Sequence, residues 1–390
     1  TTTDVVIINE GRPVAAPSGA VVGGHETMVS AVRAHTFGIG GDSRIQHNPL
    51  SDDDFTIGPS RATPLVVAAI ERPSILSALS QQLERGRAQE TDGVFLWLRE
   101  IAGSDRGASR AERDVLAELA NFSEGASLES VARTQLAHNA INRLISSGAV
   151  GVSAFTPTDA AHILEIDNRY SVDAAVVGGI LLARQLDRFG VPLAVSEADM
   201  AGLVIQRVRE RTAEAVLIAA ADHDALSATE LSLVLKAQRS RVSATDRSPL
   251  LRMELGVAAS VALVGAPAHC LGPANTEEWR IHSAIPDHFE IANAFGSAIG
   301  DIRLAHQITV SAPRRGLYRV HIDEPITFYD LKAAQQFAEE KAEAHLRNEM
   351  RFAGGQSCNI THNWDLEQAI VEERELFVEA TLKSRALGSP

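Results

Sequence analysis

The chain opens with three threonines and an aspartate, which stand directly before the apolar run Val5 to Ile8. That run is rich in β-branched residues and predicts a buried strand. The residues Asn9 to Pro13 are of turn-forming types and predict the end of the strand. The pattern therefore places Thr1 to Asp4 on a loop at the mouth of a strand.

A second strongly apolar stretch, from Val257 to Gly265, breaks at the loop Gly265-Ala266-Pro267. The run Trp279 to Ile285 predicts the strand that follows. Changes from strand to loop of this kind form ligand sites in α/β folds. We therefore expect this loop and the opening threonines to face a shared cleft.

Helical periodicity dominates the middle of the chain. Between residues 60 and 154, amphipathic stretches recur at helical spacing. Long helices are predicted from Ser171 to Phe189 and from Ser196 to Thr212, and the apolar run Ala215 to Ala221 predicts a short buried strand or a helix end. The last part predicts strand, helix and strand over Ile308 to Ile322, Tyr329 to Arg351 and Leu376 to Ala386.

These patterns predict an α/β protein with four consecutive regions. Residues 1–59 form the first part of a core, and residues 60–154 form a mainly helical insert. Residues 155–306 form the second part of the core, and residues 307–390 form a C-terminal α+β appendage. Two helices and a strand around Ala149 to Val152 resemble a small winged-helix unit within the insert.

Composition narrows the classes of partner. The formal net charge is -14, which argues against nucleic acid or an anionic membrane as the main partner, so we interpret the winged-helix-like unit as packing rather than DNA binding. No apolar stretch approaches the ~20 residues of a membrane helix. Cys270 and Cys358 are the only cysteines, which is typical of a reducing cytoplasm and too few for a thiolate metal site.

The polar residues of the first loop are suited to phosphate chemistry. The hydroxyls and backbone N–H groups of Thr1, Thr2 and Thr3 can reach phosphate oxygens, and Asp4 can hold a hard cation such as Mg²⁺. The run Gly40-Gly41-Asp42-Ser43 is a second candidate. Its glycines let the backbone approach a ligand, while Asp42 and Ser43 supply a metal or phosphate contact. Either segment alone also fits an ordinary polar loop.

Histidines near these segments leave alternatives open. His35 precedes the glycine-rich turn, so it serves either a site or a structural hydrogen bond. Asp159 and His162 are three residues apart, so they either share a metal or act separately, with Thr158 or Asp159 capping a helix.

The order of these segments resembles the hydantoinase/5-oxoprolinase family, in particular its hydantoinase A-like subunits. The matching segments span most of residues 1 to 300 and are Thr1-Thr2-Thr3-Asp4-Val5, Val22-Gly23-Gly24, His35-Thr36 with Gly40-Gly41-Asp42-Ser43, Ile57-Gly58-Pro59, Phe155-Thr156-Pro157-Thr158-Asp159-Ala160, Leu263-Val264-Gly265-Ala266-Pro267-Ala268-His269, and Ile285-Pro286-Asp287-His288 with Ala292-Asn293-Ala294. Each match is short, and their common order carries the resemblance. The resemblance implies an actin-like ATPase core of the ribonuclease H-like type.

In that family two glycines normally precede the Thr-Thr-Thr-Asp run, and a whole domain lies upstream of it. Neither precedes the run in this sequence, so we expect an N-terminal truncation with a missing N-terminal lobe. Half of a two-lobed cleft cannot close on a substrate or exclude water. We therefore expect this chain alone to be inactive or nearly so.

The resemblance also implies roles for the candidate residues. Thr1 to Asp4 would grip the phosphates of ATP, and Gly265-Ala266-Pro267 would lie beside its adenosine. Asp4 and His35 would be the catalytic residues, serving Mg²⁺ or another divalent metal, or the acyl substrate. The family's commonest activity is the ATP-dependent hydrolysis of a cyclic amide, such as a hydantoin or 5-oxoproline, with a hydantoinase B-like partner subunit. We expect a cytoplasmic enzyme with no nucleic-acid or membrane partner.

Three other functions fit the same residues. Related proteins are ATPase subunits of ATP-dependent ketone carboxylases, and the sequence does not separate the two chemistries. An N-terminal threonine such as Thr1 can also be the nucleophile of a self-processed hydrolase, with its own α-amine as the base. A non-catalytic nucleotide-binding subunit is the third alternative.

Overall fold

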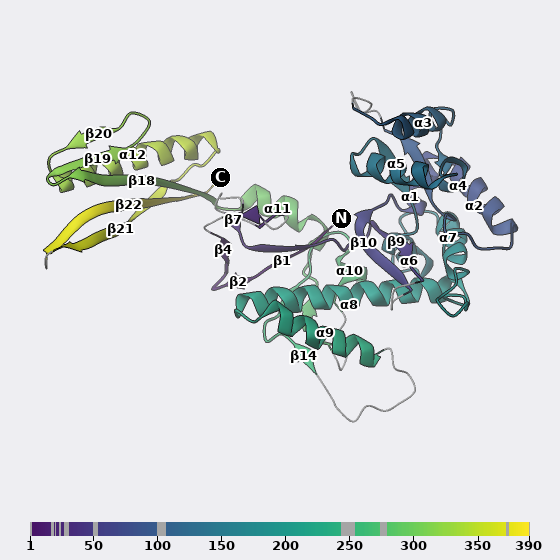
Figure 1. Cartoon of the computed structure of the whole chain (residues 1–390). Coiled ribbons are helices and arrows are strands. Elements are labelled where there is room, and N and C mark those ends of the chain that lie inside the picture. Colours follow the sequence, from purple (N-terminus) through teal and green to yellow (C-terminus); the bar gives the residue numbers. More distant parts are fainter. Residues whose placement is uncertain are drawn as a thin grey trace. The chain divides into compact units, whose positions relative to one another are not determined.

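The computed structural model describes residues 2–16, 19, 21–22, 25–26, 31–49, 54–99, 107–242, 254–273, 279–371 and 374–389. The chain is a mixed α/β protein with 41% helix and 27% strand in several sheets (Figure 1). It divides into two compact units, Thr1–Glu290 and Ile291–Pro390. The α/β class is confirmed at this level, and the four regions stay predictions.

The first predicted strand is present but is only half-buried. β1 (Thr3–Val6) pairs antiparallel with β8 (Ala34–Phe37) in a two-stranded ribbon. Side chains along β1 alternate between two faces, so Val5 packs into a hydrophobic cluster while Val6 is 39% exposed and Ile8 beyond it is 59% exposed. The prediction that Val5 to Ile8 is fully buried is therefore wrong, because the outer face of the ribbon is exposed.

The predicted turn at Asn9 to Pro13 is confirmed. β2 (Ile8–Asn9) pairs antiparallel with β3 (Arg12–Pro13), and Glu10 and Gly11 between them both have positive φ, as a two-residue hairpin turn requires. Two further short pairs follow: β4 (Ala15–Ala16) with β7 (Ala31–Val32), and β5 (Val21–Val22) with β6 (His25–Glu26).

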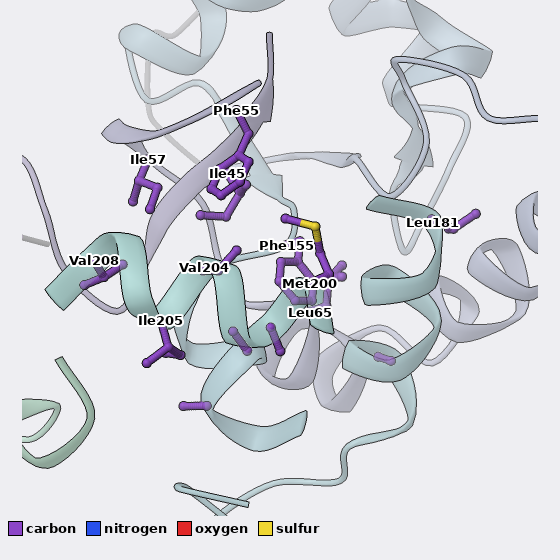
Figure 2. Close-up of a cluster of buried hydrophobic side chains, with 14 of the residues drawn as sticks. Ile45, Phe55, Ile57, Leu65, Phe155, Leu181, Met200, Val204, Ile205 and Val208 are labelled. Atoms are coloured by element: carbon purple, nitrogen blue, oxygen red, sulfur yellow. The ribbon is translucent and has the colours of Figure 1, made fainter. Parts of the chain in front are cut away.

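The largest hydrophobic core lies between a hairpin and a group of helices. β9 (Ser43–His47) pairs antiparallel with β10 (Phe55–Arg61), and their side chains Ile45, Phe55 and Ile57 pack against α8 (Glu197–His223). Figure 2 shows these side chains over Val204 and Val208 of α8. The other helices of this core are α1 (Leu65–Glu71), α2 (Ser74–Glu84), α6 (Pro157–Ile163) and α7 (Asp173–Ala183).

α8 is longer than the sequence predicts. The prediction ended a helix at Thr212 and assigned Ala215 to Ala221 to a separate element, yet one helix of 27 residues covers both. The first half of α8 buries side chains such as Val204 and Val208 in the core of Figure 2. The second half buries Leu217 and its neighbours in a different cluster.

A second hydrophobic core is formed by Ala62 and by residues between 94 and 154. Its sheet has the order β12-β11-β13, formed by β11 (Phe95–Leu98), β12 (Ala126–Ser127) and β13 (Val150–Ser153). Three helices pack on this sheet: α3 (Arg110–Leu119), α4 (Leu128–Val131) and α5 (Gln135–Ser146). α3 begins with a capping box, in which Ser109 Oγ accepts the Glu112 N–H and the Glu112 carboxylate accepts the Ser109 N–H.

The second cluster on α8 joins it to α9 (Ala228–Val242) and to two short parallel strand pairs. These pairs are β14 (Leu255–Gly256) with β16 (Trp279–Arg280), and β15 (Val261–Ala262) with β17 (Ser283–Ala284). Val5 of β1 and Val261 of β15 both pack in this cluster. The predicted strand from Val257 to Gly265 is therefore reduced to the two residues of β15, and α10 (Ala268–Leu271) follows it.

The second unit is a five-stranded antiparallel sheet with a helix on one face. The strand order is β20-β19-β18-β22-β21, formed by β18 (Ile302–Arg314), β19 (Leu317–His321), β20 (Ile326–Phe328), β21 (Asn359–Val371) and β22 (Arg374–Gly388). The predicted C-terminal helix is confirmed as α12 (Leu331–Phe352), capped by Asp330. At intervals of four residues it buries Ala334, Ala338, Ala342, Leu346 and Met350.

Two short elements, η1 (Phe289–Ile291) and α11 (Ala292–Ile299), precede this sheet in the sequence. Among the residues with described positions, no helix combines the length and the apolar character that crossing a bilayer requires.

Two histidines meet where α12 packs on the sheet. The ring centroids of His306 on β18 and His345 on α12 are 4.2 Å apart. Burial lowers the pKa of His306, the neighbouring His345 lowers it further, and Asp323 opposes the decrease. Folding therefore disfavours the charged form of His306.

This lowered pKa predicts a loss of stability in acid. The unfolded chain binds a proton at about pH 6.5, so the stabilisation is complete above that pH and is lost as the pH falls through the lower folded-state pKa. We expect His306→Gln to reduce the decrease in melting temperature between about pH 7.5 and pH 5. Exposed His282→Gln is the control, and an unchanged pH dependence in His306→Gln would contradict the prediction.

Candidate functional site

The start of β1 is tied to β8 and to the loop that follows β8. Asp4 Oδ1 accepts a hydrogen bond from Thr36 Oγ1 (2.6 Å), and Asp4 Oδ2 accepts one from Thr2 Oγ1 (3.2 Å). Thr3 Oγ1 donates to the backbone oxygen of Ile39 (2.8 Å). Thr3 and Asp4 thus lie within the strand, and not on a loop before it as predicted.

Asp4 and His35 lie on opposite faces of this ribbon. Residues directly opposite each other across an antiparallel ladder share a face, which groups Asp4 with Thr36 and Val5 with His35. Asp4 is exposed, whereas His35 Nε2 is shielded from solvent and lies 3.5 Å from Asp222 Oδ2 of α8. One metal ion therefore cannot bind both side chains in this arrangement. A metal role for either residue alone stays a prediction.

The metal prediction gains no support from other side chains. Within the described ranges, no group of three or more His, Cys, Asp or Glu side chains is placed to hold a metal ion. Thr1, the first of the predicted phosphate contacts, lies outside the described residues. The same is true of Gly23 and Gly24, which contribute to the family resemblance.

The run Gly40-Gly41-Asp42-Ser43 forms a tight turn before β9. Ser43 Oγ accepts the Gly40 N–H (2.9 Å), and the Ser43 N–H donates to the Gly40 oxygen (3.0 Å). Ser43 is only 1% exposed, so its hydroxyl belongs to the interior of the turn. Asp42 is at the surface and forms an ion pair with Arg61 of β10 at 3.3 Å.

Thr158 of α6 fixes the same turn from the other side. Its N–H (3.0 Å) and its Oγ1 (2.9 Å) both donate to the backbone oxygen of Gly41. α6 begins with Thr156 as the N-cap residue, Pro157 in the first turn and Asp159 completing a capping box. The sequence prediction that Thr158 or Asp159 is the cap itself is therefore wrong by two or three positions.

Asp159 and His162 form separate hydrogen bonds. The buried Asp159 carboxylate accepts the Val66 N–H (2.9 Å), the Thr156 N–H (2.9 Å) and the Thr156 hydroxyl (2.8 Å). Burial raises the pKa of Asp159 to about 6, against the lowering effect of these hydrogen bonds. His162 Nδ1 instead donates to the backbone oxygen of Thr158 (2.8 Å). Asp159 thus belongs to the capping box of α6 and His162 to a separate hydrogen bond, which favours the alternative in which the two residues act separately.

The loop Gly265-Ala266-Pro267 is held by its own backbone bonds. Gly265 has a φ of +102°, and its N–H donates to the backbone oxygen of Phe289 (2.7 Å). Cys270 Sγ donates to the backbone oxygen of Pro267 (3.2 Å), and burial raises the pKa of this thiol to about 11. Cys270 is therefore a structural thiol at neutral pH.

These contacts bring the predicted loops together. Thr3 donates to Ile39, which stands two residues before Gly41. A Cβ placed on Gly41 would lie 4.0 Å from the Cβ of Pro267, which is ordinary van der Waals contact. The start of β1, the glycine-rich turn and the loop after β15 thus lie near one another, and the shared cleft between them stays a prediction.

Sequence reasoning missed the α8 residues that position these loops. Arg209 Nε donates to the backbone oxygen of Cys270 (3.1 Å), and Arg211 donates to a backbone oxygen of β10. Asp222 pairs with His35, as described above. Charged residues interrupting an apolar helix were the available signal, but they are also typical of a solvated helix face.

Comparisons with protein-family models, with curated proteins and with solved structures found no match for this chain. The family resemblance stays a prediction from the residues, and so do the ATP, the divalent metal and the cyclic amide that it implies.

The packing of Gly41 predicts that a larger residue will not fit there. A Cβ at this position would lie 2.8 Å from Thr158 Oγ1, so Gly41→Ala should displace Thr158 and weaken its hydrogen bond to the turn. We expect a loss of about 1–3 kcal/mol in the free energy of unfolding, measured by urea denaturation.

Gly202→Ala in α8 is the matched control, because a Cβ there meets nothing within 4 Å. It should raise the free energy of unfolding by about 0.5–1 kcal/mol, since alanine is the better helix former. Equal stabilities of Gly41→Ala and the wild type would show that the turn is not confined as described.

Proposed function

We propose that this chain carries an ATP-binding site in an actin-like core and serves the ATP-dependent opening of a cyclic amide, such as a hydantoin or 5-oxoproline. One observation supports the proposal above the others. The start of β1, the turn from Gly40 to Ser43 and the loop from Gly265 to Pro267 lie together, although they are distant in the sequence. Hydroxyl-rich and glycine-rich segments gathered at strand ends are suited to phosphate binding.

The outer face of the β1–β8 ribbon provides the oxygen atoms. Thr2, Asp4 and Thr36 are exposed there, and Asp4 would hold Mg²⁺ against the nucleotide phosphates. The short hydrogen bond from Thr36 Oγ1 (2.6 Å) fixes the orientation of the Asp4 carboxylate. Neighbours that orient a metal ligand in this way strengthen its grip on the ion.

The inner face of the ribbon supports the core. Val5 packs with β14, β15, α8 and α9, and His35 contacts Asp222 of α8. A strand whose inner face joins helices and parallel strands, and whose outer end carries polar residues, is consistent with one lobe of an actin-like ATPase. We assign His35 to the support of β8 and Asp4 to the ligand side.

ATP supplies the phosphoryl group that turns the unreactive amide oxygen of a lactam into a leaving group. This chain would hold the phosphates, and a cation bound by Asp4 would neutralise the charge that develops on them. The loop Gly265-Ala266-Pro267 would lie beside the adenosine.

The test is turnover by the natural polypeptide that contains this sequence, with and without Asp4→Asn. We expect ATP- and Mg²⁺-dependent hydrolysis of 5-oxoproline or a hydantoin, and a decrease on the order of 10²-fold or more in Asp4→Asn. Ketones with bicarbonate belong in the same substrate panel, because they separate a hydrolase from a carboxylase.

Two variants separate this role from a structural one. If Asp4 only accepts the Thr36 hydrogen bond, Thr36→Val and Asp4→Asn should lower the melting temperature similarly and leave turnover normal. That result would remove the main support of the proposal. Asp114→Asn, on the exposed surface of α3, is the control for loss of a carboxylate.

A further inference from the structure

Arg44, the second residue of β9, is a half-buried arginine whose Nε donor is shielded from solvent and has no hydrogen-bond partner among the described residues. Among the residues that the structure describes, no carboxylate forms an ion pair with it. Burial lowers the pKa of Arg44, and no neighbouring charge contributes to that shift. Arg44 is thus a half-buried cation with no counter-charge among the described residues.

Three other arginines of the first unit have partners within the chain. Their partners are the Asp42 carboxylate for Arg61 (3.3 Å), the Asp167 carboxylate for Arg169 (2.6 Å) and the Cys270 backbone oxygen for Arg209 (3.1 Å). Burying a charged group without a partner is costly, so such groups are normally paired or bound to a ligand. The shielded and unpartnered Nε of Arg44 therefore points to a partner from outside the chain.

The position of Arg44 connects it to the candidate site. It directly follows the turn from Gly40 to Ser43. On β9 the neighbouring Ser43 and Ile45 are buried, and alternation along a strand directs Arg44 to the opposite face, with Asp42 and Gln46. Asp42 forms an ion pair with Arg61, and no charge of Asp42 contributes to the pKa of Arg44.

We propose that Arg44 is the anchor of an oxyanion site, and that it binds the carboxylate or phosphate of a ligand held at the Gly40–Ser43 turn. A guanidinium group can form two parallel hydrogen bonds to two oxygens of either anion. The cyclic amide is one source of such an anion, since 5-oxoproline carries a carboxylate, and the nucleotide is the other. The location of the ligand rests on the proposed function, whereas the requirement for an anion does not.

The test measures binding by calorimetry, without turnover, for wild type, Arg44→Met and Arg44→Lys. The probes are inorganic phosphate, ATP and 5-oxoproline. Arg44→Met should weaken the binding of at least one probe about 10- to 100-fold, as expected for lost hydrogen bonds to a charged group. The affinity of Arg44→Lys should lie between those of the wild type and Arg44→Met, because lysine keeps the charge but cannot form two parallel hydrogen bonds. Arg113→Met, exposed on α3, should bind like the wild type.

Stability without ligand gives a second, independent readout. Removing an unpaired buried charge should leave the melting temperature of Arg44→Met equal to or above that of the wild type. A lower melting temperature would reveal a structural partner for Arg44 and overturn the proposal. Unchanged affinity of Arg44→Met for all three probes would also overturn it.

Matched ligands identify the source of the anion. An Arg44-dependent preference for 5-oxoproline over 2-pyrrolidinone, which lacks the carboxylate, assigns Arg44 to the amide substrate. An Arg44-dependent preference for ATP over adenosine assigns it to the phosphates. Arg44-dependent anion binding by a protein that hydrolyses no ATP would retain this site and reject the proposed function. If the protein shows ATP-dependent turnover and Arg44→Met changes neither that turnover nor anion binding, the result would reject this site and retain the proposed function.

Discussion

The first unit depends on α8, because this one helix is part of two hydrophobic cores and contacts β1, β8, β10 and α10. Val204 and Val208 close the core beneath β9 and β10, and Leu217 belongs to the cluster that also holds Val5 of β1. Polar contacts from α8 reach β10 through Arg211 and α10 through Arg209. Asp222 reaches β8 through His35. The loops of the candidate site therefore take their positions from a helix that contributes no residue to their ligand side.

This double role also explains why local periodicity did not reveal the whole helix. At 100° per residue, the α8 residues that pack in the first core and those that pack in the cluster around Leu217 face directions that differ by about 140°. A change of face of that size breaks the apolar stripe near Thr212, where the sequence-based prediction ended the helix. α12 has the opposite property. Its buried residues recur every four positions along one face, and the sequence predicted it to within two residues at each end.

Local sequence patterns likewise predicted some features of the candidate site, whereas its long-range contacts were not predicted. Residue types alone identify the turn at Gly40 to Ser43, because glycine with Asp and Ser is a local signal. The hydrogen bond that holds it comes from Thr158, 117 residues away, and no local pattern contains that pairing. Alternation shows that His35 and Thr36 lie on opposite faces of their strand, but only the pairing with β1 decides which one faces Asp4. The sequence therefore predicted the candidate residues and not their grouping.

Three charged groups of the first unit show how burial and partners together separate structural charges from a candidate ligand site. Asp159 is fully enclosed and accepts three hydrogen bonds from neutral donors, yet burial still raises its pKa to about 6. Asp167 is held by a forked contact with Arg169, and these hydrogen bonds lower its pKa to about 2 in spite of partial burial.

Both carboxylates have hydrogen-bond partners within the chain, so the fold alone explains each of them. Arg44 has neither the neutral partners of Asp159 nor the opposite charge of Asp167. No described residue therefore offsets the cost of partly burying this charge. An anionic ligand is the kind of partner that would offset it.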